Sequence, residues 1–331
     1  MRICLLTNQD LDADPFPADD WPCDPRPYLP EATWEVATLK KATAVEQVSA
    51  LAGNGFDLFF NLCDGAADDT TTPGIEVVHT LEEFGVPFTG ANAGFYEPSR
   101  EEMKQACRAV GIATPAHVTA RTPEDVEHAA ATLRFPLFVK HWSSYASVSL
   151  SRASRVRTPE GLRRQARKIM SRYEAALIEE YIDGIECTVL VAENPSDPAR
   201  PTTYMPMQYR FPDGESFKHA SLKWIDYNDL MAFPVQDPVL AARLREEAAR
   251  FFVALNGVSF GRCDVRVDGD GTPYMLEINP NCGVYFPSTD PGSADLSLLH
   301  DPAGHEGFTR QIVAAAMARH AEGREAAASC G

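Results

Sequence analysis

The sequence predicts an α/β protein in which a small parallel-sheet domain precedes a larger region of mixed helices and strands, and three observations lead to this fold class. Over the first 95 of 331 residues, short apolar segments alternate with helical ones, which is typical of a small parallel sheet. From Ser99 onwards the chain begins again with an amphipathic helix. Residues 261–279 form two apolar segments around the turn DGDG, which predicts a β-hairpin. We therefore expect three parts, residues 1–95, 96–175 and 176–331.

The N-terminal part is predicted to hold strands and one helix joined by polar loops. RICLLT at 2–7 and the apolar run FDLFFNL at 56–62 predict buried strands, and VPFTG at 86–90 predicts a third. Residues 75–85 predict a helix that ends at glycine. Residues 12–30 are rich in Asp and Pro, so they predict a loop that is long enough to suggest a function.

The rest of the chain is predicted to alternate between amphipathic helices and apolar strands, several of which carry charged residues. We expect helices at 100–111, 159–172 and 240–256, and strands at 135–142, 176–184 (with a connection at its end) and 186–192.

The composition is that of a soluble globular protein with an excess of acidic residues. Hydrophobic residues make up 44% and charged residues 23%, and the net charge is −17. This charge argues against nucleic acid or an anionic membrane as the main partner. A basic run at 152–168 fits either a solvated helix face or local attraction of a polyphosphate.

The cysteines and the first residues indicate a cytoplasmic protein. The eight cysteines show neither a CxxC pair nor zinc-ligand spacing, which predicts free thiols in a reducing compartment. The opening MRICLL is short for a signal-peptide core and is followed by polar residues, and no apolar run is long enough to span a bilayer.

Polar residues accompany the hairpin near the carboxyl end. Glu277 and Asn279 flank Ile278 at a spacing of two, so both side chains point to one face of the strand. Asp264 on the first hairpin strand can face Glu277 across the pair. Such oxygen donors suit Mg²⁺ (or Mn²⁺), which proteins hold through one or two carboxylates together with nucleotide phosphates. The alternative is a strand that runs into a polar turn, with Asp264 in a surface ion pair.

Charged residues elsewhere fit the same chemistry. Lys140 ends an apolar strand, where an ammonium needs an anion such as a phosphate beside it. Glu179 and Glu186 bracket the break between two strands. A lysine that reaches the solvent and two solvated glutamates are the simpler explanations, but their order along the chain favours one joint site.

These residues occur in segments that resemble the ATP-grasp superfamily, and within it the D-alanine–D-alanine ligase-like branch. The resemblance extends from Arg2 to Arg319, and its strongest parts are GVPFTG, FPLFVKHW, LIEEYIDGIECTV, FGRCDVRVDGDGTPYMLEINPNCG and the later Ser288. It implies an ATP-grasp fold behind a small pre-ATP-grasp domain, with ATP and Mg²⁺ (or Mn²⁺) as cofactors. It also implies an ADP-forming ligase that joins a carboxylate to an amine through an acyl phosphate.

The resemblance implies a nucleotide site. Lys140 is similar to the lysine that contacts the nucleotide phosphates. Glu179–Ile182 is similar to the hinge that receives adenine, with backbone groups of Glu180 and Ile182 at the adenine edge. Glu186 is similar to the acid that binds the ribose hydroxyls.

The resemblance also implies a reaction centre. Asp264, Glu277 and Asn279 match the magnesium ligands. Arg262 matches the arginine that neutralises charge on the acyl phosphate and on the tetrahedral intermediate. Lys223, in SLKWIDYND, matches the loop lysine that reaches the terminal phosphates.

Two positions near the phosphates depart from the family pattern. Arg100 stands where the family has a phosphate-contacting lysine, with Lys104 one helical turn further on. The lid turn is SSYASVS at 143–149, which keeps Ser147 as a catalytic candidate but lacks the usual glycines.

The region that would bind the activated substrate departs further. No glutamate follows the first strand to meet a substrate ammonium, although Asp10, Asp12 or Asp14 can take its place. Cys63 replaces a histidine, and Trp224 replaces a tyrosine. We therefore expect an activated carboxylate other than D-alanine, on a bulkier or less cationic molecule.

The region of the second amino acid keeps the family pattern at Gly283 and Ser288, so we expect an amino acid as the amine donor. Cys282 is expected to line the pocket, because no base stands near it to make it a nucleophile. An ATP-grasp kinase or carboxylase and a nucleotide-binding regulatory module without turnover remain as alternatives, and a homodimer is left open.

Overall fold

The computed structural model describes residues 1–17, 20–143, 150–218 and 230–329. The predictions for Ser147, Lys223 and Trp224 fall outside the described residues.

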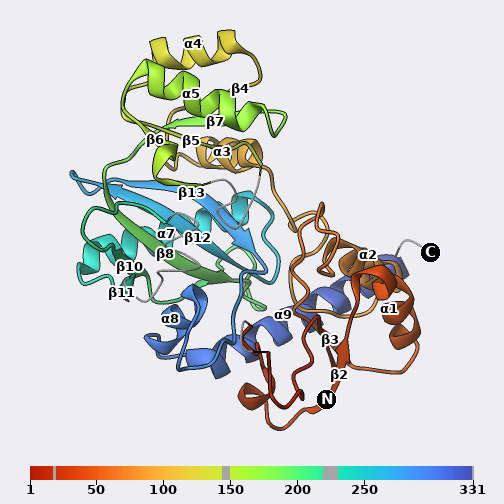
Figure 1. The fold of residues 1–331 in the computed structure, drawn as a ribbon. Coiled ribbons are helices and arrows are strands. Elements are labelled where there is room, and N and C mark those ends of the chain that lie inside the picture. The colour runs from red at the N-terminus through yellow and green to blue at the C-terminus, as the bar shows by residue number, and fades with distance from the viewer. Residues whose placement is uncertain (18–19, 144–149, 219–229, 330–331) are drawn as a thin grey trace.

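The N-terminal domain is a three-stranded parallel sheet, as the sequence predicts. Strands β1 (Arg2–Thr7), β2 (Thr33–Thr38) and β3 (Leu58–Asn61) pair in the order β2-β1-β3. The helices α1 (Ala44–Ala52) and α2 (Ile75–Glu83) lie beside it (Figure 1). Two short 3-10 helices, η1 and η2, span Arg26–Tyr28 and Lys41–Thr43.

The segment predicted as a strand at 86–90 does not become one. Phe88 forms a single parallel bridge with Phe59, and the carbonyl of Pro87 accepts a hydrogen bond from the Phe59 amide. Pro87 has no amide N–H of its own, so a longer ladder is not favoured at this edge.

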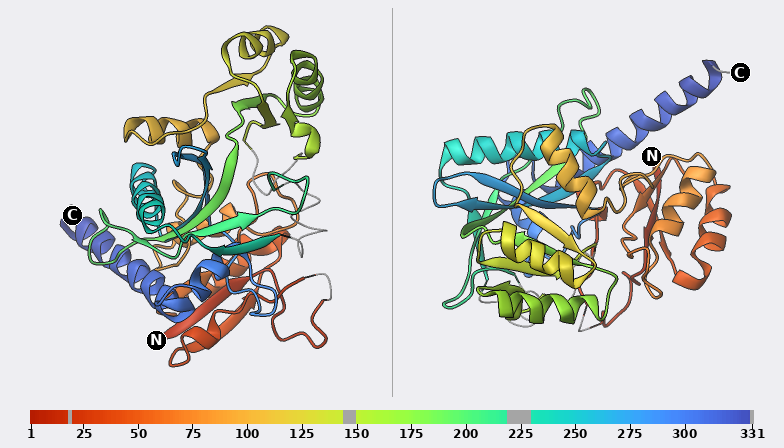
Figure 2. Two further views of the ribbon diagram at one scale, coloured as in Figure 1. Left: turned by 90° about the vertical axis from the view of Figure 1, so that its left-hand side faces the viewer. Right: turned by 90° about the horizontal axis from the view of Figure 1, so that it is seen from above.

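Alternate residues of β1 pack on two different helical layers. Cys4 and Leu6 lie in the cluster that includes α1 and α2 residues, whereas Ile3 and Leu5 lie in a cluster with Phe308 of α9 (Gly304–Ser329). Strand side chains alternate between faces, so a sheet covered on both sides is apolar at every position. Helix α9 therefore attaches the C-terminal end of the chain to the N-terminal sheet (Figure 2).

The central part is a four-stranded antiparallel sheet in the order β4-β7-β5-β6. Its elements are β4 (His117–Ala120), α4 (Pro123–Thr132), β5 (Leu137–His141), η3 (Arg152–Ser154), β6 (Arg155–Val156), α5 (Pro159–Met170) and β7 (Ala176–Glu180). Because β7 lies between β4 and β5, the predicted boundary at 175/176 is one strand too early, and the central sheet continues to Glu180.

The C-terminal part is a six-stranded sheet with the path β11-β10-β8-β12-β13 and with β9 beside β8. Its strands are β8 (Gly184–Ala192), β9 (Thr202–Thr203), β10 (Met207–Arg210), β11 (Met231–Pro234), β12 (Phe260–Asp268) and β13 (Pro273–Pro280). Its other helices are α3 (Arg100–Ala109), α7 (Pro238–Ala254) and α8 (Ser293–Leu299).

One face of this sheet packs on helices and the other carries polar residues. Cys187, Val189 and Val191 of β8 lie in a core cluster with residues of α3 and α7, and β12 contributes Cys263 and Val265 to the same cluster. Since strand side chains alternate, the intervening residues of both strands face away from this core. These intervening positions hold the charged residues of the site.

The C-terminal and central sheets border a cleft of about 690 Å³, to which the N-terminal domain also contributes residues. The chain passes from β7 to β8 at Gly184, which has a φ of 151°. A Cβ atom at Gly184 would lie 2.0 Å from the carbonyl oxygen of Val267 on the neighbouring strand β12, so only glycine fits at the start of β8.

Two features concern the chain as a whole. Within the described residues, no helix is long and apolar enough to cross a membrane. The seven cysteines there are free thiols, and six of them are buried.

Candidate active site

The hairpin places the predicted metal ligands face to face. Asp264 of β12 pairs in register with Glu277 of β13, and Arg262 pairs with Asn279. A β-bulge follows Asp264, so Met275 points into the core while Glu277 and Asn279 point to the cleft. Glu277 and Asn279, two residues apart, thus lie on the same side of β13 as the cleft, next to Asp264 on β12.

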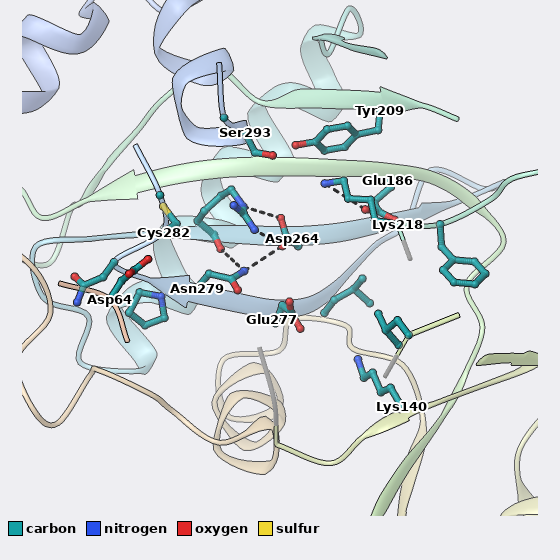
Figure 3. A pocket seen from close by; sticks show the side chains of 18 of the residues that line it. Asp64, Lys140, Glu186, Tyr209, Lys218, Asp264, Glu277, Asn279, Cys282 and Ser293 are labelled. Carbon is teal, nitrogen blue, oxygen red and sulfur yellow. Dashed lines mark hydrogen bonds and ion pairs between the residues drawn. The ribbon is translucent and has the colours of Figure 1, made fainter. Parts of the chain in front are cut away.

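Asp264 is the most connected of these ligands. It accepts two hydrogen bonds from Arg262 at 3.1 and 3.0 Å, one from Thr188 at 2.9 Å and one from the amide of Asn279 at 3.1 Å (Figure 3). Burial alone would raise the pKa of Asp264, but the charges of Arg262 and Lys218 hold it well below its usual range. The carboxylate is thus ionised at neutral pH and able to bind a cation.

Glu277 forms an ion pair with Arg100 of α3. Burial opposes ionisation, but Arg100 and Lys140 together hold the pKa of Glu277 below its ordinary value. Arg100 lines the cleft, whereas Lys104 is 2% exposed and binds Glu179 and the Thr114 hydroxyl instead. Arg100, rather than Lys104, is therefore the cation that can reach a ligand in the cleft.

Glu179 lies between two lysines from different elements. Its carboxylate is 2.5 Å from Nζ of Lys104 and 2.6 Å from Nζ of Lys140 on β5. Burial lowers the pKa of Lys140 to about 8, against the opposing charge of Glu179. The side chain of Glu179 thus holds Lys140 at the cleft wall.

The predicted adenine hinge lies between β7 and β8. Glu180 and Ile182 both line the cleft, next to an aromatic cluster in which the Phe138 and Phe217 rings are 4.9 Å apart. The Ile182 carbonyl accepts a hydrogen bond from Arg266, and its N–H donates none to another described residue. One backbone donor beside aromatic rings is what a planar base requires.

Glu186 of β8 reaches the cleft next to this hinge. Its carboxylate lies 3.3 Å from Arg266 and 3.5 Å from Lys218. Tyr209 of β10 lies beside Lys218, and its hydroxyl is buried without a hydrogen-bond partner among the described residues. Figure 3 shows this hydroxyl directed toward that of Ser293, at the start of α8. The sequence interpretation included neither Lys218, Tyr209 nor Ser293.

The predicted substrate residues separate in the structure. Gly283 lines the cleft, and so does Cys282, whose pKa burial raises to about 12 so that the thiol stays protonated. Cys63 is buried and does not line the cleft, and Ser288 is exposed outside it. The structure brings Ser293, rather than Ser288, to the cleft.

Asp64 is an acid at the end of the cleft that holds Cys282, where the sequence predicts the substrates. It follows Cys63 and lines the cleft near Cys282 (Figure 3), whereas Asp10, Asp12 and Asp14 are exposed elsewhere. The surrounding protein partly desolvates Asp64 and raises its pKa to about 6, although the residue remains exposed to the cleft. No cationic side chain pairs with it within the described part of the chain.

The 12–30 loop supplies one wall of this end. Trp21 lines the cleft, and its indole N–H donates to Asp290. The side chain of Gln9 donates to the Trp21 carbonyl at 2.9 Å and accepts from the Cys23 amide at 3.0 Å, which ties the loop to the end of β1. The sequence analysis singled out the 12–30 loop but not Trp21, because no strand or helix pattern there indicates which side chain faces the cleft.

The residues present fit magnesium together with a nucleotide. No group of three His, Cys, Asp or Glu side chains that could hold a metal ion occurs in the described ranges. Asp264 and Glu277 with the amide oxygen of Asn279 nevertheless form a partial set of hard oxygen donors, which nucleotide phosphates would complete. Two sheets, a hinge and this donor set define an ATP-grasp enzyme.

Comparisons with known proteins agree with this class. Residues 107–309 match the family model described as D-ala D-ala ligase C-terminus, and the chain belongs to this family. It is 27% identical to the D-alanine–D-alanine ligase of Cupriavidus necator, over 82% of this chain and 79% of that one. It is 29% identical to that of Xanthomonas axonopodis pv. citri, over 74% of each.

Solved structures support the fold. The D-alanine–D-alanine ligase of Bacillus anthracis, complexed with ATP, matches with a TM-score of 0.67 at 17% identity, over 97% of this chain and 99% of that one. The D-alanine–D-alanine ligase of Coxiella burnetii gives 0.70 at 14% identity, over 99% and 97%. The chain is thus an ATP- and Mg²⁺-dependent ligase that forms a C–N bond between small molecules.

Proposed function

We propose that this ligase activates a carboxylate other than D-alanine and joins it to an amino acid. The observation that carries the proposal is the substrate end of the cleft, where Trp21 and Asp290 form one wall and Asp64 faces the interior. A wall built from the long 12–30 loop sets the shape and charge of the space that the first substrate would occupy. The relatives are named D-alanine–D-alanine ligases, and under this proposal the first substrate is where this protein would differ from them.

The proposed reaction has two steps. A carboxylate oxygen of the first substrate attacks the terminal phosphorus of ATP, and the bond to ADP breaks. The amine of the second substrate then attacks the acyl carbon, a proton leaves the nitrogen, and phosphate departs. Bound Mg²⁺ would be held by Asp264, Glu277 and Asn279 and would neutralise charge on the phosphoryl groups.

The chain's own cations take defined parts in these steps. Lys140, fixed by Glu179, would stabilise charge on the transferred phosphoryl group. Arg262, fixed by Asp264, would stabilise the oxyanion of the tetrahedral intermediate. Gly283 and the hydroxyls of Ser293 and Tyr209 are available to the second amino acid, and the unpartnered Tyr209 hydroxyl supports this assignment.

The proposal includes small-molecule substrates and a cytoplasmic location. A net charge of −17 supports small-molecule substrates rather than nucleic acid or an anionic membrane. Free thiols on all seven described cysteines support a cytoplasmic location.

A substrate panel tests the proposal. Purified protein with ATP and Mg²⁺ is given pairs of carboxylic acids and amino acids, including two D-alanines, and ADP and products are measured by mass spectrometry. We expect an amide from a pair other than D-alanine with D-alanine, and no product from Glu277→Ala. Efficient D-alanyl-D-alanine synthesis with no better pair would contradict the substrate assignment. ADP with a phosphorylated product would indicate a kinase, and no ADP from any pair a binding module.

A further inference from the structure

Lys218 is a cation of the cleft to which the assigned site gives no role. Its side chain is 15% exposed, and Nζ lies 3.5 Å from Oε1 of Glu186 and 3.3 Å from the centre of the Tyr209 ring. Nζ makes no hydrogen bond to another described residue, since the contact to Glu186 is an ion pair at a longer distance. The ammonium therefore keeps its N–H donors available to a ligand.

The other cations that line the cleft are held more tightly. Nζ of Lys140 is 2.6 Å from Glu179, and the guanidinium of Arg262 makes two hydrogen bonds to Asp264. Burying an ammonium without hydrogen bonds is unfavourable, so a site that does so is completed by an anion. Lys218 differs from Lys140 and Arg262 in having room for that anion.

The position of Lys218 indicates which anion this is. Figure 3 shows its ammonium below the Tyr209 ring and between Glu186 and Asp264. Glu186 lies at the hinge end of the cleft and Asp264 at the metal end, so the chain of phosphates of a nucleotide passes between them. Burial by itself lowers the pKa of Lys218, but Tyr209, Glu186 and Asp264 keep it above its ordinary value, so the ammonium stays charged.

We propose that Lys218 and the ring face of Tyr209 form an anion subsite that binds an inner phosphate of ATP. The ammonium donates charge-assisted hydrogen bonds to the phosphate oxygens, and the ring holds it by a cation–π contact. Lys140 comes from β5 of the central sheet, whereas Lys218 follows β10 of the C-terminal sheet. The phosphates are thus held from both walls of the cleft.

Nucleotide binding without any ligase substrate tests this subsite. ATP, ADP and adenosine are titrated against a fluorescent adenosine analogue that lacks phosphate, so that the probe itself does not depend on Lys218. Lys218→Met is expected to weaken the binding of ADP and ATP by about tenfold or more, which is the effect of losing a charged hydrogen bond. The affinity for adenosine should stay unchanged. Lys218→Arg should keep most of the affinity.

Matched variants separate this role from others. Lys40→Met removes an exposed lysine away from the cleft and should change nothing. Tyr209→Phe keeps the ring face and should retain ADP affinity, whereas Tyr209→Leu should lose part of it. Thermal unfolding identifies any variant that fails to fold. If Lys218→Met fails to fold, Lys218→Gln replaces it as an uncharged variant with a polar side chain. Equal weakening of ADP and adenosine would show that Lys218 only positions Glu186 for the ribose, and unchanged ADP affinity would also overturn the proposal.

Discussion

The buried cluster of Glu179 with Lys104 and Lys140 allows a quantitative prediction about stability. The three side chains are 4%, 2% and 9% exposed, so their charges are almost fully removed from water. Replacing Glu179 by Gln keeps the size of the side chain and removes the only charge that lies within 2.6 Å of both ammonium groups in the described part of the chain.

The expected loss follows from the charges left behind. Breaking a buried ion pair by removing one partner typically costs about 3–5 kcal/mol, because the other charge stays buried and uncompensated. Glu179→Gln leaves two such charges, so we expect the upper part of this range unless one lysine loses its proton. Lys140 is the one to do so, because burial already lowers its pKa to about 8. Urea unfolding followed by circular dichroism measures the change in the free energy of unfolding.

A surface ion pair provides the control. Glu127 and Arg163 are 2.6 Å apart but half exposed, so Glu127→Gln should leave unfolding nearly unchanged. In the double variant Lys104→Met/Glu179→Gln, part of the loss should return, since one uncompensated ammonium has been removed. If Glu179→Gln unfolds at the same urea concentration as Glu127→Gln, the cluster does not stabilise the cleft wall in the way described.

Three further predictions concern the cleft itself. Lys140→Ala and Glu277→Ala should each reduce ADP formation by about a hundredfold or more in a folded protein, and near-normal turnover in either would exclude it from the site. The surrounding protein raises the pKa of Asp64 to about 6, so the folded protein holds that proton to a higher pH than the unfolded chain, and stability falls as pH rises from about 4 to 6. The fall is small, because Asp64 is exposed to the cleft and solvent screens its charge. Asp64→Asn should therefore raise the unfolding temperature above pH 6 and change it little near pH 4; a constant difference would contradict the assignment. Trp21→Ala should raise the KM for the activated acid while the KM for ATP stays the same, and equal increases would show a general loss of structure.

The residues that the sequence assigns to the nucleotide end lie on strands or next to them, and the structure brings them to one cleft. The alternation of side chains places Glu186, Asp264 and Glu277 on one surface whatever the details of packing. The parallel N-terminal sheet was predicted for the same reason, although β2 was missed because its sequence TWEVAT is half polar. The side-chain role of Glu179 was not predicted, because it depends on Lys104, a residue of α3 that is distant in sequence.

The substrate end was predicted less well because its residues lie on loops and at element ends. Ser288 was chosen by its place in the family pattern, but residues 287–289 do not line the cleft, and Ser293 is the serine that does. Cys63 was chosen by its place in the family pattern, but its side chain turns into the core and Asp64 turns outward. A loop can change length without cost to the sheets, so spacing along the chain loses its meaning there.

Strands hold the residues around the nucleotide, whereas loops hold the residues at the other end of the cleft. The groups around the nucleotide are fixed by strand register and by ion pairs such as Asp264 with Arg262. Trp21 depends instead on contacts made by loops, namely the hydrogen bonds with Gln9 and Asp290. Under the proposed function, a change in the 12–30 loop would therefore alter the first substrate while the sheets remain as they are, because function resides in sites carried on a fold.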